Sequence, residues 1–199
     1  MTLPITSVFS SAIERVQRQV ISTALVYTSH ERWPLPPTQE LPRAPPQITI
    51  SVLDSSFNPP TLAHLALANA TNPFSLASDY DAKLLLLSVR NADKAIQEGD
   101  ATLSQRVEMM SLLAKGIHEE SPSSPQNVAV GLVNEPTFIA KASTLRRFLD
   151  DRLAGLAFDS SHATSVQLTF LMGPSQYMHQ IRLTNSVLIC LVIFRLRHS

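Results

Sequence analysis

The residue types that could perform chemistry are concentrated in one stretch, DSSFNPPTLAH, from Asp54 to His64. Ser55 and Ser56 are small, so backbone amides beside them can approach a phosphate closely. The two prolines stiffen the turn by fixing φ, and Thr61 can cap a following helix with its hydroxyl. His64 then falls in the first helical turn, where unpaired amides and the helix dipole favour an anion. The pattern predicts a phosphate site in which His64 donates to a phosphate oxygen; the alternative is an ordinary histidine on a helix surface.

This stretch lies between two expected elements. Ile48 to Leu53 is a short run rich in β-branched residues, which indicates a buried strand, and Thr61 to Ala70 indicates a helix. Ligands of parallel sheets bind at the carboxyl ends of the strands, next to the helices that follow them. The candidate residues are therefore expected at the ligand-binding edge of a sheet.

The rest of the chain repeats the alternation of strand and helix. Such alternation predicts an α/β fold, a Rossmann-like, doubly wound parallel sheet covered by helices on both faces. The further expected strands are Ala82 to Val89, Val128 to Leu132 and Val166 to Met172, and the further expected helices are Leu103 to Gly116 and Phe138 to Leu153.

Residues 1–46 are expected to form an appendage to this domain. Ile13, Val16 and Val20 lie at helical spacing, which predicts an amphipathic helix from Ser10 to Val26; a transit peptide is the alternative. Six of the fourteen prolines lie between Pro34 and Pro46, which indicates an extended surface linker. A ligand for SH3-type domains is the alternative function of this proline-rich stretch.

Composition narrows the class of protein. Sixteen basic residues balance sixteen acidic ones, so the chain lacks the net positive charge of a typical nucleic-acid-binding protein. Its one cysteine, Cys190, excludes an intrachain disulfide and favours a reducing compartment. The apolar run Val187 to Phe194 is too short to cross a bilayer, which needs ~20 residues. No membrane association is expected, and the cytoplasm, with access to the nucleus, is the expected location.

The segment SSFNPPTLAH resembles the first signature of the nucleotidylyltransferase superfamily, in the T-x-x-H form of the nicotinamide mononucleotide adenylyltransferases. The wider stretch ISVLDSSFNPPTLAHLALANA is similar to the fungal branch of that family. Four further segments resemble the family in the same order along the chain: Leu84 to Lys94, Leu103 to Ala114, Asn134 to Leu145 and Leu168 to Gly173. The resemblance implies a nucleotidylyltransferase domain over residues 47–173.

The resemblance also implies roles for individual residues. His64 would contact the α-phosphate of ATP as the catalytic residue. The residues that would contact ATP are Ser55, Ser56, Phe57, Asn58, Thr61, His64 and Gly173. Lys94, Arg106 and Phe138 would bind the second substrate. The alternatives for these three are a solvated lysine, a surface arginine and a core phenylalanine.

The implied reaction transfers AMP from ATP to nicotinamide mononucleotide (NMN) and yields NAD and pyrophosphate. No covalent enzyme intermediate is needed, so the protein contributes alignment and stabilisation of charge on the phosphate oxygens. Mg²⁺ would neutralise the leaving pyrophosphate. No dense carboxylate cluster predicts a metal site made by protein alone, so the ion is expected to ride on the nucleotide.

One departure from the family pattern concerns its late S-S-T-x-x-R signature. No such string follows Gly173, and the similar string from Ser143 to Arg147 precedes the expected last strand. Residues 174–199 are therefore expected to be a divergent tail, with the C-terminal part of the fold incomplete. Loss of one charge-assisted contact would slow turnover by about a hundred- to thousandfold. The alternatives are a non-catalytic nucleotide-binding or scaffold protein, and a related enzyme with another phosphorylated acceptor, such as pantetheine phosphate or choline phosphate.

Overall fold

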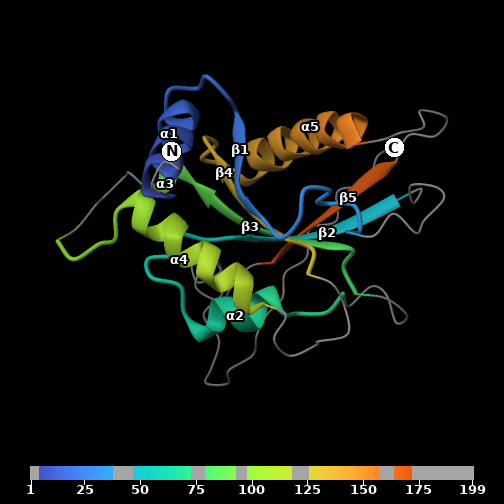
Figure 1. Ribbon diagram of the computed structural model, residues 1–199, viewed down its shortest axis with the longest axis horizontal. Coiled ribbons are helices and arrows are strands. Elements are labelled where there is room, and N and C mark those ends of the chain that lie inside the picture. The colour runs from blue at the N-terminus through green and yellow to red at the C-terminus, as the bar shows by residue number, and fades with distance from the viewer. Residues whose placement is uncertain are drawn as a thin grey trace.

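The computed structural model describes residues 5–37, 47–72, 79–92, 98–117, 126–156 and 164–171. They form helices and strands in alternation (Figure 1). In chain order these are α1 (Ile5–Gln17), β1 (Thr23–Thr28), β2 (Gln47–Asp54), α2 (Leu62–Ala68), β3 (Ala82–Ser88), α3 (Val89–Ala92), α4 (Leu103–Gly116), β4 (Val128–Val133), α5 (Phe138–Leu156) and β5 (Ser165–Leu171). The strands and helices predicted after residue 46 are confirmed to within a few residues at each end.

The strands form one sheet in the order β1-β4-β3-β2-β5. Neighbours among β2, β3, β4 and β5 are parallel, and only β1 runs antiparallel, beside β4. The chain builds outward from β2 to β3 and β4 and then returns to place β5 on the other side of β2. Such a reversal is the topological switch point at which open α/β sheets bind ligands. It places the carboxyl end of β2 beside that crevice.

Each face of the sheet carries its own apolar layer. Leu85 and Leu87 of β3 belong to the cluster that packs with α1, α2 and α4, whereas Leu84 and Leu86 belong to the cluster that packs with α5. Figure 1 shows α5 on one side of the sheet and α2 and α4 on the other. Because both faces are covered, β3 is buried along its whole length, which explains its continuous apolar run. The α/β prediction is confirmed, and the mostly parallel sheet is compatible with a Rossmann-like fold, while the predicted incompleteness of its C-terminal part stays a prediction.

The N-terminal prediction of one helix from Ser10 to Val26 is wrong in its second half. Helix α1 ends at Gln17, and Gln19 has a left-handed φ of 58° that turns the chain away. Val20, assigned to the apolar face of the helix, is 67% exposed. The chain then enters β1, where Thr23 to Thr28 includes β-branched and aromatic residues and pairs with β4.

The predicted surface linker is also wrong at its start. Trp33 is fully buried and Leu35 is 5% exposed, both in the apolar layer that packs with α5. Asn127 donates to the carbonyl of Pro34 at 2.8 Å, and Arg152 donates through Nε to the carbonyl of Trp33. Residues 5–37 thus share the sheet and core of the following domain. The linker residues 38–46 and the tail 174–199 lie outside the described residues, and the domain boundaries at 46 and 173 stay predictions.

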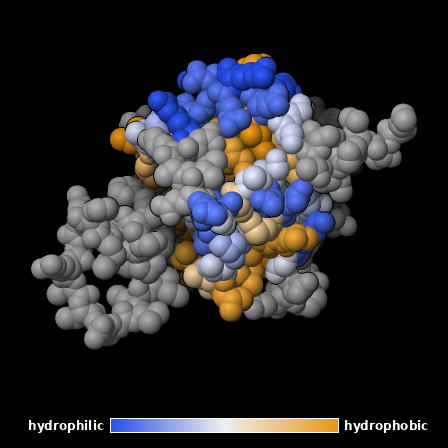
Figure 2. All heavy atoms as spheres, turned by 90° about the vertical axis from the view of Figure 1, so that its left-hand side faces the viewer, coloured by the Kyte–Doolittle hydropathy of each residue, from blue (hydrophilic) through white to orange (hydrophobic). Residues whose placement is uncertain are grey.

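The surface over the described residues mixes polar and apolar side chains. Figure 2, which views the molecule from the left-hand side of Figure 1, shows hydrophilic and hydrophobic residues interspersed on this face. The large apolar residues that are exposed within the described ranges lie in separate parts of the fold, namely the turn after α1 and helices α2, α4 and α5: Val20, Leu62, Leu112 and Ile139. None of the helices in the described ranges is long and apolar enough to cross a membrane.

Candidate functional site

The loop after β2 is shaped by one buried aromatic ring. Phe57 is fully buried in the layer beneath α2 and α4, and it adopts a left-handed φ of 45°. A non-glycine residue in this region is strained, and the surrounding structure must offset that strain; here burial of the ring does so. The amide of Ser55 still continues the ladder, donating to the carbonyl of Leu86 at 3.2 Å. The loop is therefore anchored on both sides of the exposed Ser56.

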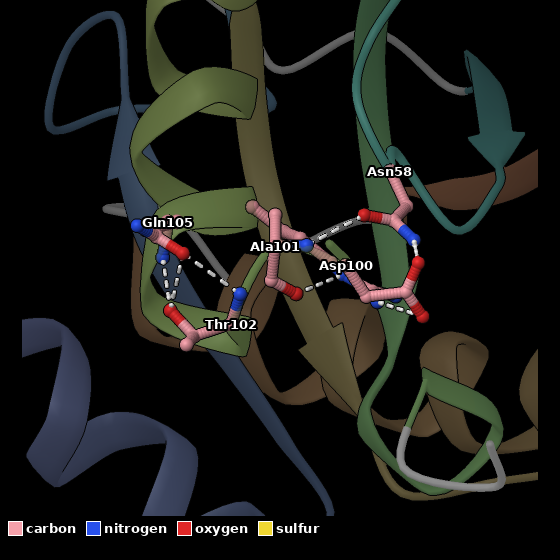
Figure 3. Close-up of polar contacts among 6 residues, drawn as sticks. Asn58, Asp100, Ala101, Thr102 and Gln105 are labelled. Atoms are coloured by element: carbon pink, nitrogen blue, oxygen red, sulfur yellow. Dashed lines mark hydrogen bonds and ion pairs between the residues drawn. The ribbon is translucent and has the colours of Figure 1, made fainter. Parts of the chain in front are cut away.

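Asn58 joins this loop to the start of α4 (Figure 3). Its Nδ2 donates to Oδ1 of Asp100 at 2.7 Å, and its Oδ1 accepts from the amide of Ala101 at 2.9 Å. Both ends of the amide group are thus used within the protein. The prediction that Asn58 lies near reacting phosphates stays a prediction. Its side-chain amide is already hydrogen-bonded to Asp100 and Ala101.

Arg106, in α4, contacts the same junction. Its side chain is 4% exposed, its Nε donates to the carbonyl of Ala101 at 2.8 Å, and a guanidinium nitrogen lies 3.9 Å from Oδ2 of Asp100. The turn at residues 100–101 is therefore fixed by Asn58 on one side and by Arg106 on the other. The predicted role of Arg106 in orienting a mononucleotide stays a prediction, while the contacts assign it a structural one.

The imidazole of His64 is fixed by contacts on both nitrogens. The backbone amide of Thr61 donates to Nδ1 at 3.0 Å, and the Thr61 hydroxyl lies 2.8 Å from the same atom. Because an N–H donates to Nδ1, that nitrogen carries no proton, and the proton of the neutral ring is on Nε2. Nε2 lies 2.9 Å from Oγ of Ser55 and donates to it. The ring thus presents one N–H at the carboxyl end of β2.

The surroundings of this imidazole favour its uncharged form. His64 is half-buried, and its ring packs against Phe57 with centroids 5.0 Å apart. Burial disfavours the charged form, so the pKa of His64 is lowered from its ordinary value of 6.5. His64 also occupies the third position of α2, where its Nδ1 accepts from the amide of the N-cap residue, Thr61. Thr61 was predicted to cap α2 with its hydroxyl; it stands at the N-cap, and its hydroxyl contacts Nδ1 of His64.

A buried ion pair flanks the same strand end and was missed by sequence reasoning. Nζ of Lys141, in α5, lies 2.6 Å from Oδ2 of Asp54, the last residue of β2. The side chains are 7% and 17% exposed. The signal was present: Lys141 occupies a buried helical position between Phe138 and Leu145, where the periodicity of α5 calls for an apolar residue.

Three predicted site residues remain: Phe138, Lys94 and Gly173. Phe138 packs edge-to-face on Phe170 with centroids 4.4 Å apart, as a core phenylalanine does. Its predicted contact with a pyridine ring stays a prediction. Lys94 and Gly173 lie outside the described residues. Within the described ranges, no group of three or more His, Cys, Asp or Glu residues is arranged to hold a metal ion.

Comparisons with known proteins give a partial relative. The chain is 35% identical over 103 residues to a protein of Schizosaccharomyces pombe named "Putative nicotinamide mononucleotide adenylyltransferase". The match covers 52% of this chain and 36% of the relative, so it spans about a third of the relative's length. No family model matches the chain, and no solved structure matches it. The similarity gives weak support for a nucleotidyltransferase.

Proposed function

We propose that this protein is a nucleotidylyltransferase that transfers AMP from ATP to NMN, producing NAD and pyrophosphate. The observation that carries the proposal is the placement of His64, whose Nδ1 accepts from the Thr61 amide and whose Nε2 lies 2.9 Å from Oγ of Ser55 at the carboxyl end of β2. That strand end lies at the switch point of the sheet, where a nucleotide is expected. The partial similarity to a protein named for the same activity supports the choice of substrates.

The chemistry needs alignment rather than a nucleophilic side chain. An oxygen of the NMN 5′-phosphate attacks the α-phosphorus of ATP, and a new P–O bond forms. The bond from the α-phosphorus to the bridging oxygen breaks, and pyrophosphate leaves with the electron pair. Negative charge on the non-bridging oxygens of the α-phosphate is stabilised by hydrogen-bond donors that are already in place. Nε2–H of His64 is such a donor, and the Ser55 hydroxyl is a second.

The donor geometry supports this role. The amide of Thr61 and the hydroxyl of Ser55 hold the ring from opposite sides. A phosphate oxygen of ATP that approaches both Nε2 of His64 and Oγ of Ser55, which lie 2.9 Å apart, would accept a hydrogen bond from each. This binding requires no change of tautomer at His64, so both donors are in place before the reaction.

Mg²⁺ would neutralise negative charge on the leaving pyrophosphate. The carboxylates beside the loop are already engaged, Asp54 with Lys141 and Asp100 with Asn58. We therefore expect the phosphates of the nucleotide, and not protein carboxylates, to hold the ion.

The test is product formation by the purified full chain with ATP, Mg²⁺ and a panel of acceptors. NMN, nicotinate mononucleotide, pantetheine phosphate and choline phosphate are each supplied, and pyrophosphate release and the adenylylated product are measured. The proposal predicts NAD from NMN. Product from another acceptor only would make the protein a nucleotidylyltransferase of different specificity. ATP binding by calorimetry without turnover on any acceptor would indicate a non-catalytic nucleotide-binding protein.

A further inference from the structure

The ion pair between Asp54 and Lys141 is largely buried at the carboxyl end of β2. Among the ion pairs of the described residues it is the shortest, at 2.6 Å, and both side chains are largely buried. Burying two charges carries a desolvation penalty that can exceed their attraction, and apolar residues of similar volume are often at least as stable. The neighbouring positions of α5, Ala142 and Leu145, are apolar and buried. A lysine at position 141 therefore suggests a role beyond packing.

The ion pair and the contact between Ser55 and His64 lie on opposite faces of the sheet. Side chains alternate along β2, so Asp54 follows Val52 to the side of the sheet packed by α5. Ser55 is the next residue, and its hydroxyl meets His64 on the α2 side. The last peptide of β2 is thus held from both sides, by Lys141 through Asp54 and by His64 through Ser55.

We propose that Lys141 is a positioning residue that, by binding Asp54, fixes the end of β2 and with it the Ser55 hydroxyl that meets Nε2 of His64. The proposal rests on the proposed function for its effect on turnover, but its effect on the imidazole is independent of any reaction. The proposed role of Lys141 is exerted through Asp54 and not through contact with substrate. It acts across the sheet, from a helix on the face opposite to α2.

Two consequences separate positioning from general stabilisation. When the Asp54 contact is lost, Ser55 shifts relative to the ring and Nε2–H exchanges faster with water, whereas Nδ1 stays the acceptor of the Thr61 amide. Turnover falls about tenfold to a hundredfold, because displacement by a fraction of an ångström of a group that aligns the reaction has effects of this order. The Kd for ATP stays within about twofold if the pair affects alignment more than ground-state binding.

The experiment uses the full chain labelled with ¹⁵N-histidine. The double variant Asp54→Asn/Lys141→Met removes the pair without leaving an unpaired buried charge, and Lys141→Arg keeps the cation. Arg146→Met is the matched control, because it removes a longer and more exposed ion pair, with Asp150, from the same helix. Nitrogen shifts and Nε2–H exchange of His64 are recorded by NMR, with kcat, KM for NMN and Kd for ATP measured alongside.

The expected result is faster Nε2–H exchange and a lower kcat in the double variant, with both restored toward wild type in Lys141→Arg and unchanged in Arg146→Met. Unchanged His64 signals and unchanged kcat in a folded double variant would overturn the proposal. If the double variant does not fold, Asp54→Ser/Lys141→Leu is used, which also leaves no unpaired buried charge, with the same two outcomes. Absence of turnover in the wild type would refute the proposed function, while the NMR comparison would still decide the role of Lys141.

Discussion

Oγ of Ser55 lies 2.9 Å from Nε2 of His64, nine residues further along the chain. The contact joins the end of β2 to the first turn of α2 and closes the intervening loop. Since the Thr61 amide occupies Nδ1, the Ser55 hydroxyl receives the only N–H of a neutral ring. This arrangement makes the protonation state of His64 the property on which the proposed chemistry depends.

The pH dependence of stability follows from that protonation state. Burial lowers the pKa of His64 below 6.5, so the unfolded chain binds a proton more readily than the folded one. The His64 contribution is therefore complete above pH 6.5 and is lost as pH falls through its folded-state pKa. Burial lowers the pKa of His30 as well, so the measurement compares wild type with His64→Asn. We expect the Tm of the wild type minus that of His64→Asn to decrease as pH falls from 7.5 to 5. A constant difference would contradict this assignment.

Replacement of Asn58 tests the junction between the loop and α4. Asn58→Ala removes two hydrogen bonds and leaves the half-buried amide of Ala101 without its acceptor, so we expect a loss of about 1–3 kcal/mol in the free energy of unfolding. Asn58→Asp should be less stable still near neutral pH, because its carboxylate would face Asp100. Urea unfolding measures both. Equal stability of Asn58→Asp and wild type would contradict the observed contacts.

Arg106 allows its structural and substrate roles to be separated. Removing one partner of a buried ion pair lowers stability by about 3–5 kcal/mol, and the partial exposure of Asp100 favours the lower end. Arg106→Met is therefore expected to destabilise the fold by about that amount. Arg106→Lys keeps a cation but loses the Nε contact with Ala101, and we expect an intermediate loss. Unchanged stability with a raised KM for NMN would instead favour the substrate role predicted from the resemblance.

Trp33 tests whether the N-terminal segment belongs to the domain. The ring is fully buried in the layer that packs with α5, and replacing a buried tryptophan by alanine costs about 3–5 kcal/mol. We expect Trp33→Ala to lower the urea midpoint strongly. Glu31→Ala, at a nearby exposed position, should leave it nearly unchanged. A Trp33→Ala protein as stable as Glu31→Ala would contradict the contribution of Trp33 to this core.

Local patterns were sufficient for most of the fold but not for its N-terminal part. The strands after residue 46 were predictable because each is an apolar run bounded by turn residues, and α4 was predictable from its periodicity. Strand β1 was not, because helical spacing continued across the turn at Gln19. Trp33 was not, because the prolines beside it indicated an exposed linker.

The candidate site was predictable only where its residues are close in sequence. Ser55, Thr61 and His64 lie within one loop and one helical turn, so spacing alone indicated that they meet. Asp54 and Lys141 are 87 positions apart, and Asn58 and Asp100 are 42 apart. Such contacts depend on how the elements pack, which periodicity in one sequence does not reveal. A lysine within the apolar face of α5 was the single local signal.

The most direct test of the account is the single-turnover rate of NAD formation in His64→Ala compared with Leu62→Ala. Leu62 lies in the same helix and is 83% exposed, so its replacement controls for effects on α2. If Nε2–H of His64 stabilises the α-phosphate in the transition state, its loss should slow the reaction about a hundred- to thousandfold, while Leu62→Ala reacts at nearly the wild-type rate. If the wild type forms NAD and His64→Ala forms it at the same rate as the wild type and Leu62→Ala, the central claim is contradicted.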